Sequence, residues 1–232
     1  MTETHETARQ LTVTGPSRTP YGEAFDEQIR LRDDCIASAG ARNYLMLVEH
    51  PPTITVGRSG GVRDVLADDG RLDERGVTVV ETNRGGEVTF HGPGQLVAYP
   101  IIDLRSRGRD LHRYLRDLEA WLVRLCRSYA VPAHADSPHT GVWVEDRKIA
   151  SIGIAVRRWV TYHGVALNVD VDLDYFRLIV PCGLTDVRMT SLEQELGAAP
   201  PLEDVAARAT EMFCEAFGMR VSTSFRGEVA AG

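Results

Sequence analysis

The chain has 232 residues, 43% of them hydrophobic and 25% charged, and a formal net charge of −7. The length fits one large domain, and the composition is typical of a globular protein that buries a substantial core. The acidic balance argues against general nucleic-acid binding, and no apolar run approaches the roughly 20 residues that cross a bilayer, so we expect neither a nucleic-acid nor a membrane partner.

In chain order, the sequence predicts a polar start followed by alternating strands and helices. Residues 1–20 are rich in polar and turn-forming residues and are expected to be a flexible segment, with a single domain over 21–226. Apolar periodicity predicts helices at 22–39, 110–129 and 200–217. Short β-branched and apolar runs predict strands at 44–48, 53–56, 77–80, 95–102, 141–145, 148–156, 160–169 and 221–225. We therefore expect an α/β (α+β) fold, a mixed β-sheet with flanking helices around one core.

The most informative stretch lies between two of these predicted strands. It reads Arg84-Gly85-Gly86-Glu87-Val88-Thr89-Phe90-His91, and a Gly92-Pro93-Gly94 turn follows it. Glycines let a backbone come close to a ligand, and the polar residues among them can orient that ligand. The stretch is therefore the first candidate for a binding site.

Lys148 is the only lysine among the 26 basic residues, the other 25 being arginine. An amine can lose its proton in a protein, whereas a guanidinium does not. Lys148 is therefore a candidate acid/base. The alternative is a surface ammonium at the start of a strand, after a hairpin turn at Asp146-Arg147, in a protein whose genome favours arginine codons.

Cys182 differs in its setting from the other cysteines. It lies between Pro181 and Gly183, which predicts a sharp, rigid turn that can hold a thiol partly exposed. Judged alone, it is as well explained by a structural role as by a nucleophilic one. A nucleophilic thiolate needs a nearby base or cation, for which Lys148, His91 and His163 are the candidates.

The remaining cysteines, Cys35, Cys126 and Cys214, fall in helical apolar periods and are expected to be small core residues. The four cysteines contain no C-x-x-C pair, and the polar N-terminal residues 1–10 show no signal-peptide pattern. These features predict no zinc site and a cytoplasmic protein with reduced thiols.

Small residues on two adjacent predicted strands suggest a slot. Gly153 interrupts one strand, and His163-Gly164-Val165-Ala166 gives the next one the same small character. Ile152, Val165 and Leu167 could supply apolar walls. An extended hydrocarbon chain would suit such a slot.

Five arginines fall within twelve residues: Arg105, Arg107, Arg109, Arg113 and Arg116. They predict either a solvated helix face or a surface that meets an acidic partner.

Five ordered blocks, at residues 49–58, 84–99, 148–154, 163–168 and 181–192, together resemble a known family. They are similar to the signature of the octanoyl-[acyl-carrier-protein]:protein N-octanoyltransferases of lipoate biosynthesis. The resemblance spans about residues 22–220. It implies a fold similar to the catalytic fold of biotin and lipoate protein ligases.

The resemblance also implies a role for individual residues. Cys182 would be the nucleophile that carries the acyl group as a thioester, and Lys148 the acid/base that activates it. The acyl group would be bound by residues of three blocks: Arg84, Gly85, Gly86, Glu87, Val88, Thr89, Phe90 and His91; Ser151, Ile152 and Gly153; Gly164, Val165 and Ala166.

The implied reaction moves an octanoyl group from octanoyl-acyl carrier protein to a lysine of a lipoyl domain. Expected acceptors are the lipoyl domains of 2-oxoacid dehydrogenases and the H protein of the glycine cleavage system. No cofactor is expected, neither ATP nor a metal, and the sequence holds no G-x-x-x-x-G-K-[ST] phosphate loop.

Three other functions compete with this one. An ATP-dependent lipoate or biotin ligase would share the fold but would not require Cys182. A cysteine-dependent thioesterase would pass the acyl group to water. A catalytically silent acyl-binding or carrier-docking protein would have no need to retain both Cys182 and Lys148.

Overall fold

We describe the fold from a computed structural model of the chain, which describes residues 9–136, 139–180 and 187–225. The helices are α1 (Tyr21–Ala37), α2 (Asp69–Glu74), α3 (Leu111–Arg127), α4 (Leu192–Leu196) and α5 (Leu202–Phe217). Short 3-10 turns are η1 (Val62–Asp64), η2 (Leu104–Arg107) and η3 (Leu173–Leu178). In this part of the chain, no helix is both long enough and apolar enough to cross a membrane.

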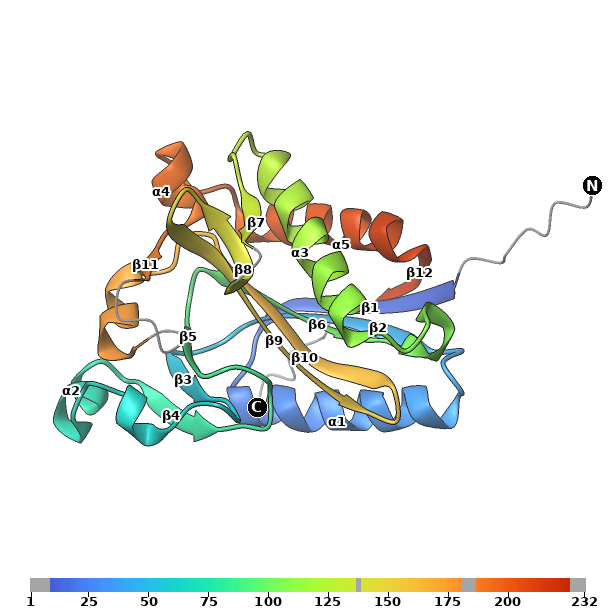
Figure 1. Cartoon of the computed structure of the whole chain (residues 1–232), viewed down its shortest axis with the longest axis horizontal. Coiled ribbons are helices and arrows are strands. Elements are labelled where there is room, and N and C mark those ends of the chain that lie inside the picture. Colours follow the sequence, from blue (N-terminus) through green and yellow to red (C-terminus); the bar gives the residue numbers. More distant parts are fainter. Residues whose placement is uncertain (1–8, 137–138, 181–186, 226–232) are drawn as a thin grey trace, which may run out of the picture.

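The larger sheet runs through the centre of the molecule (Figure 1). Its strands are β1 (Arg9–Arg18), β2 (Asn43–Glu49), β6 (Gln95–Ile101), β7 (His134–Asp136), β8 (His139–Val144), β9 (Arg147–Arg157), β10 (Val160–Asn168), β11 (Arg188–Met189) and β12 (Met219–Phe225). Their order is β12-β1-β2-β6-β10-β9-β8-β7, and β11 pairs with β9 outside this path. Pairs β1/β2, β1/β12 and β9/β11 are parallel and the rest antiparallel, so the predicted mixed sheet is confirmed.

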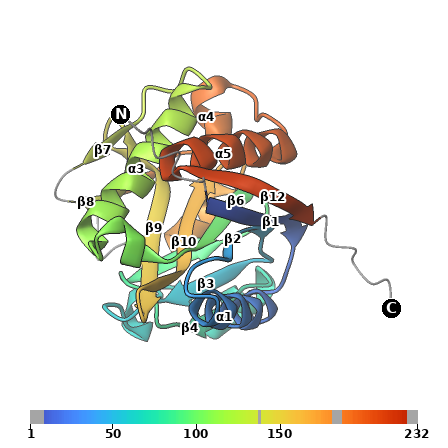
Figure 2. The same cartoon turned by 90° about the vertical axis from the view of Figure 1, so that its right-hand side faces the viewer.

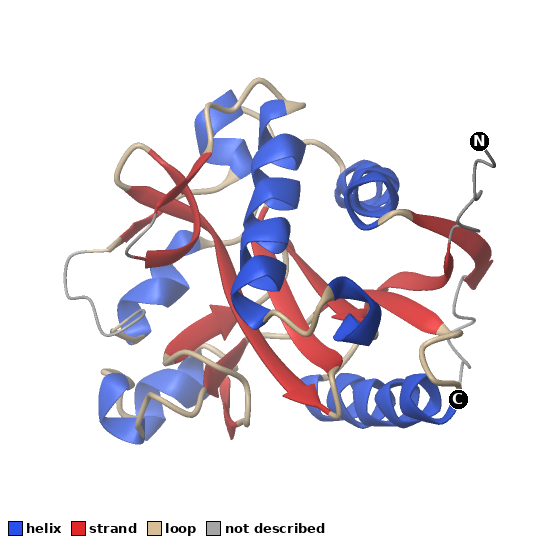
Figure 3. Ribbon diagram, turned by 45° about the vertical axis from the view of Figure 1, so that its right-hand side comes forward, coloured by secondary structure: helices blue, strands red, loops and turns tan. Residues whose placement is uncertain are grey.

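Helices cover both faces of this sheet (Figure 3). On one face α3 and α5 pack against each other, and the ring centroids of Trp121 and Phe213 lie 5.1 Å apart in an edge-to-face contact. Both rings belong to the largest cluster of buried apolar residues. On the other face, α1 buries Ala24, Leu31 and Cys35 against β2, β6 and β10. The ends of the three long helices lie within two residues of their predicted bounds, because their apolar stripes are regular.

A second, smaller sheet contains β3 (Thr53–Val56), β4 (Thr78–Glu81) and β5 (Val88–His91), in the order β4-β3-β5. It has its own apolar cluster, in which the Phe90 ring stacks on Tyr175 with centroids 4.5 Å apart. The sequence predicts β3 and β4, but it predicts neither β5 nor the separation of these strands from the main sheet. Strand runs of similar composition do not reveal which strands pair.

The prediction of a flexible segment over residues 1–20 is wrong for Arg9–Arg18. This stretch is β1, which pairs with β2 on one side and β12 on the other (Figure 2). Leu11 and Val13 are buried in the core, while Thr12 between them and Thr14 after them are partly exposed. Such alternation is the signature of a half-buried strand, although the polar composition and the Gly15-Pro16 pair concealed it. Strand β12 confirms the predicted edge strand near the end of the domain.

Candidate active site

A cavity of about 290 Å³ is lined by residues of both sheets and by the start of α1. It brings together most of the candidates predicted from the sequence: Arg84, Gly86, Glu87, Val88, Thr89, His91, Lys148, Ser151, Ile152, Gly153, Gly164, Val165 and Ala166. These residues come from three separate stretches of the chain. Their convergence is the main structural reason to regard the cavity as the active site.

Two glycines of the cavity wall lie opposite each other on neighbouring strands. Gly153 of β9 pairs with Gly164 of β10. A Cβ on Gly164 would lie 2.2 Å from the carbonyl oxygen of Ala98, and one on Gly153 would lie 2.9 Å from the carbonyl oxygen of Gly85. Neither position therefore tolerates a side chain. Neighbouring backbone fills the space beside both glycines, so they serve close packing, and the slot between the strands stays a prediction. Of its expected apolar walls, Ile152 and Val165 line the cavity, whereas Leu167 is buried in the main core cluster.

Two members of the predicted binding set do not line the cavity. The Gly85 amide donates a hydrogen bond to the carbonyl of Ile154 at 2.8 Å, so Gly85 attaches its loop to β9. The Phe90 side chain is fully buried in the apolar cluster of the smaller sheet, on the opposite face of β5 from Thr89 and His91. Alternation along a strand sends neighbouring side chains to opposite faces, so a contiguous motif cannot contribute every residue to one site.

Arg84 is buried at the cavity wall with its guanidinium fixed by neutral oxygens. Its Nη2 donates to the carbonyl of Thr55 at 2.6 Å and to Thr55 Oγ1 at 2.9 Å, and its Nη1 donates to the carbonyl of Gly85 at 3.1 Å. The arginine thus connects β3 to the glycine loop. It also places a permanent positive charge beside the cavity.

Three histidines near the cavity are held neutral by burial: His50, His91 and His163. Burial lowers the pKa of His50 to about 4, and those of His91 and His163 to about 3. A neutral imidazole supplies no positive charge to a thiolate at neutral pH. The structure therefore argues against His91 and His163 as cationic partners of a reactive cysteine.

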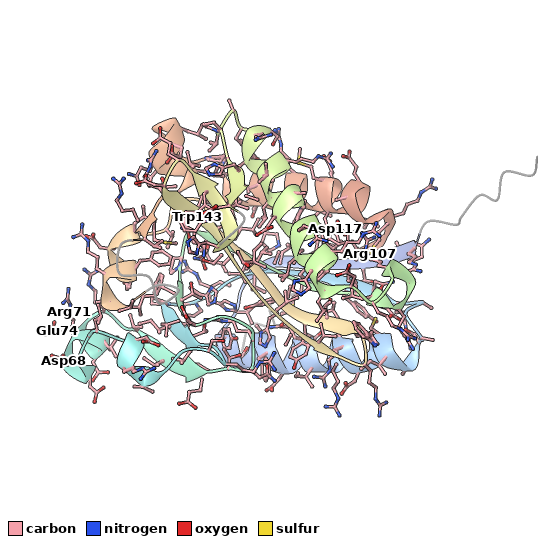
Figure 4. All side chains as sticks on the ribbon, viewed as in Figure 1. Asp68, Arg71, Glu74, Arg107, Asp117 and Trp143 are labelled. Carbon is pink, nitrogen blue, oxygen red and sulfur yellow. The ribbon has the colours of Figure 1, made fainter. Side chains whose placement is uncertain are left out.

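Lys148 lies at the cavity wall and is only 3% exposed, so the alternative of a surface ammonium is wrong. Its Nζ lies 5.2 Å from the centroid of the Trp143 ring, which Figure 4 places on the β8/β9 hairpin. A Cβ on Gly141 would come within 2.5 Å of Lys148 Cε. The turn of the hairpin is Glu145-Asp146, one residue earlier than predicted, which makes Lys148 the second residue of β9.

Cys182 lies outside the described residues. The described residues that follow Cys182 in the sequence lie beside Lys148. Met189 of β11 pairs with Lys148, and the Thr190 amide donates to the Lys148 carbonyl at 2.9 Å. The core assignment of the other cysteines is confirmed for Cys35 and Cys126. Both are buried in helices, and burial raises the pKa of each thiol to about 12.

Among the described residues, six that line the cavity lie outside the predicted catalytic and binding residues. Val97 and Tyr99 belong to the 84–99 block but were given no role, and the sequence analysis did not anticipate Tyr21, Ser59, His139 and Thr140 at all. Tyr21 begins α1, and its hydroxyl donates to Thr82 Oγ1 at 3.2 Å. Nothing in the local sequence of these residues distinguishes them from surface residues, since only the packing of distant segments brings them to the cavity.

The arginine stripe is partly satisfied within the molecule. Arg105 forms an ion pair with Asp103 at 2.6 Å, and Arg107 pairs with Asp117 at 2.8 Å (Figure 4). Arg113 and Arg116 are exposed on α3, and Arg109 is exposed just before it. An acidic partner at this stripe stays a prediction that concerns chiefly these three residues.

The chain is similar to known proteins over most of its length. The family model of the lipoyl protein ligase A/B catalytic domain matches residues 24–214. The octanoyltransferase of Geobacter metallireducens is 52% identical over 170 residues, covering 73% of this chain and 76% of the relative. The octanoyltransferase of Chloroflexus aggregans is 45% identical over 215 residues, covering 91% of this chain and 97% of the relative.

Solved structures show the same fold at low sequence identity. A lipoate-protein ligase A bound with ATP superposes with a TM-score of 0.72 at 16% identity, covering 95% of this chain and 90% of that chain. A bipartite lipoate protein ligase from Thermoplasma acidophilum superposes with a TM-score of 0.70 at 17% identity, covering 95% and 88%. The chain therefore belongs to the lipoyl protein ligase A/B catalytic domain family and, within it, to the octanoyltransferases, acyltransferases of lipoate biosynthesis.

Proposed function

We propose that this octanoyltransferase uses a cysteine/lysine pair, with Cys182 carrying the octanoyl group as a thioester and Lys148 moving the protons. The donor is octanoyl-acyl carrier protein, and the acceptor is a lysine of a lipoyl domain. The single observation that best supports this proposal is the position of Lys148. The only lysine of the chain is buried at the wall of the cavity that gathers most of the binding residues predicted from the sequence.

In the first step, the thiolate Sγ of Cys182 attacks the carbonyl carbon of the octanoyl thioester. A new C–S bond forms to Cys182, the C–S bond to the pantetheine of the carrier breaks, and the departing sulfur takes a proton from the Lys148 ammonium. The Lys148 amine is left neutral. One thioester replaces another, so this step is nearly balanced in energy.

In the second step, the acceptor lysine arrives as an ammonium, since the reference pKa of lysine is about 10.4. Neutral Lys148 takes one of its protons, which frees the nitrogen to attack the acyl carbon. The C–N bond forms, Cys182 leaves as a thiolate, and the second proton of the new amide nitrogen passes to solvent. Because an amide is more stable than a thioester, the sequence runs downhill, and we propose that it requires neither ATP nor a metal.

The acyl chain would lie in the cavity that residues of β9, β10 and the Arg84–His91 stretch line together. Val97, Ile152, Val165 and Ala166 give the wall an apolar character that suits a hydrocarbon. The neutral state of the nearby histidines fits the same substrate, because it keeps charge away from the chain.

The proposed acceptors are the lipoyl domains of 2-oxoacid dehydrogenases and the H protein of the glycine cleavage system. Support comes from the bipartite ligase of Thermoplasma acidophilum, whose structure is described together with its E2 lipoyl domain. Because that protein has the same fold, we propose that this chain also has a site that accepts a lipoyl domain.

The test is intact-protein mass spectrometry after mixing the enzyme with octanoyl-acyl carrier protein in the absence of ATP and with a metal chelator. We expect wild type to gain one octanoyl group, which an apo lipoyl domain then removes. Cys182→Ser should form no thioester, and Lys148→Ala should acylate far more slowly. Cys214→Ser, a change in a half-buried helical cysteine, is the matched control and should behave as wild type.

The competing functions give different results in the same experiment. Release of free octanoate without an acceptor would indicate a thioesterase. Activity that needs ATP and free octanoate, with no adduct on the enzyme, would indicate a ligase. A bound but unreacted donor would indicate an acyl-binding protein, and each of these outcomes would overturn the proposal.

A further inference from the structure

A chain of buried hydrogen bonds connects the wall of the cavity to the backbone of Lys148. Its side chains are Arg84, Thr55, His91, Gln95 and Asn168, and it ends on the backbone of Thr190 and Lys148. Each of these side chains is at least nine-tenths buried. The chain crosses from the smaller sheet to the larger one.

The direction of each bond follows from the groups themselves. Gln95 Nε2 lies 2.9 Å from Asn168 Oδ1 and 3.2 Å from the carbonyl of Phe90, both acceptors, so the amide nitrogen faces them. Gln95 Oε1 is then the acceptor for His91 Nδ1–H at 2.8 Å. His91 is therefore protonated on Nδ1 and bears its lone pair on Nε2, 3.4 Å from the Thr55 hydroxyl.

The other members continue in the same sense. The Arg84 guanidinium donates to Thr55 Oγ1, which leaves the hydroxyl proton of Thr55 to point toward His91. At the far end, Asn168 Nδ2 donates to the Thr190 carbonyl at 2.9 Å, and the Thr190 amide donates to the Lys148 carbonyl at 2.9 Å. Every donor thus points from the cavity toward Lys148, an arrangement in which successive hydrogen bonds polarise one another.

Asn168 occupies the decisive place in this chain. It faces Gln95 across the β6/β10 pair, where directly opposite side chains are neighbours. It is also the side chain that holds the Thr190 carbonyl, and Thr190 directly follows β11, which pairs with β9 at Lys148. Without the Asn168 donor, the short two-residue strand β11 would lose an anchor beside Lys148.

We propose that Asn168 is a positioning residue for the transfer reaction, which clamps the Thr190 backbone against Lys148 and so fixes the amine relative to the acyl cavity. Asn168 touches neither the substrate nor the reacting atoms. The inference rests on the proposed role of Lys148 as the acid/base. It adds the requirement that Asn168 hold the Thr190 backbone, which the cysteine/lysine mechanism alone does not need.

The test variant is Asn168→Asp, which keeps the shape of the side chain and the acceptor for Gln95 but removes the donor to Thr190. The matched control is Thr161→Val. Thr161 is a fully buried residue on the same strand, its hydroxyl bonds to the backbone of Pro100, and it takes no part in the chain or in the cavity lining. Asn168→Asp removes the hydrogen bond to the Thr190 carbonyl, whereas Thr161→Val removes both the bond to the Pro100 carbonyl and the one from the Ile102 amide, so the control perturbs β10 at least as much.

The assay is single-turnover acylation by octanoyl-acyl carrier protein, followed across pH and donor concentration, with thermal unfolding recorded in parallel. Displacement of a catalytic group by about 1 Å costs on the order of 100-fold in rate. For Asn168→Asp we expect a 10- to 100-fold lower maximal rate, a donor concentration for half-maximal rate within about twofold of wild type, and a shifted midpoint of the pH–rate profile. Thr161→Val should lose stability and keep both the maximal rate and the midpoint.

Two outcomes distinguish a failure of this inference from a failure of the proposed function. If wild type forms no acyl-enzyme, the proposed function fails. If wild type reacts and Asn168→Asp matches its rate and pH midpoint, only the positioning role of Asn168 is overturned. Should Asn168→Asp fail to fold, Gln95→Glu takes its place, since it removes the donor to Asn168 while keeping the acceptor for His91. If neither variant folds, the chain is a requirement of the fold alone, and the positioning role is also overturned.

Discussion

Gly141→Ala provides the sharpest test of how the hairpin holds Lys148. Gly141 has φ +136, a conformation that alanine rarely adopts, and its new Cβ would lie 2.5 Å from Lys148 Cε and 2.8 Å from the carbonyl oxygen of Ala150. Ordinary carbon–carbon contact needs about 3.5 Å, so the lysine must move by about 1 Å. A displacement of that size costs on the order of 100-fold in rate.

The same change also affects stability, and the two effects must be separated. An unfavourable φ costs about 1–2 kcal/mol, and overpacking about 1–3 kcal/mol more. The matched control is Gly197→Ala, because Gly197 has φ +78 and open space around its Cβ position. The control should lose only about 1–2 kcal/mol of unfolding free energy and keep its acylation rate.

Single-turnover acylation measures the rate, and urea unfolding measures the stability of both variants. We expect Gly141→Ala to be slower than Gly197→Ala by about two orders of magnitude at concentrations of urea where both remain folded. Equal rates for the two variants would refute the reasoning. They would mean either that the lysine tolerates the shift or that it does not act in the reaction.

Three further predictions concern the same region. Phe90→Ala should lower the unfolding free energy by about 3–5 kcal/mol, measured by urea denaturation, without raising the donor KM, because the ring packs away from the cavity; a raised KM at full folding would count against that placement. Trp143→Leu removes the aromatic face below the Lys148 ammonium and should slow acylation about 2- to 30-fold, the range of a partly desolvated cation–π contact, and an unchanged rate would assign that contact no role. The third concerns the buried neutral histidines: His50, His91 and His163. Their folded pKa values lie below that of the unfolded chain, so their stabilisation is complete above about pH 6.5 and is lost as pH falls. The unfolding free energy measured by urea denaturation should therefore fall between pH 6.5 and 5, by up to about 1.4 kcal/mol per pH unit for each histidine. A flat profile would contradict their burial as neutral groups.

The sequence predicted the fold best where local pattern and tertiary environment agree. Helix α3 carries its apolar residues at regular spacing, and Asp110 accepts a hydrogen bond from the Arg113 amide at its start, so both its existence and its beginning could be predicted. Strand β1 shows the opposite case. Its alternation of Leu11 and Val13 is short and set among polar residues, and only its two partner strands make it part of the core.

The sequence predicted many residues of the candidate site, but it did not predict how they are arranged in space. Gly153 and Gly164 could be identified as small residues on adjacent strands, whereas the close approach of Gly85 to Gly153 depends on how the glycine loop docks on β9. His139 and Tyr21 reach the cavity from segments with no motif of their own. Long-range packing of this kind leaves no signal in the local sequence.

Strand β1 also has a consequence for how the molecule is made. Arg9 pairs with Met219, and Leu11 pairs with both Asn43 and Val221. During synthesis β1 can join β2 soon after both strands have left the ribosome, but its other edge must wait until β12 emerges. An open strand edge is a template for pairing with other chains, and contacts between residues so distant in sequence form slowly. The nascent chain is therefore most exposed to aggregation in the interval between the synthesis of β2 and that of β12, and a chaperone that shields β1 would act in this interval.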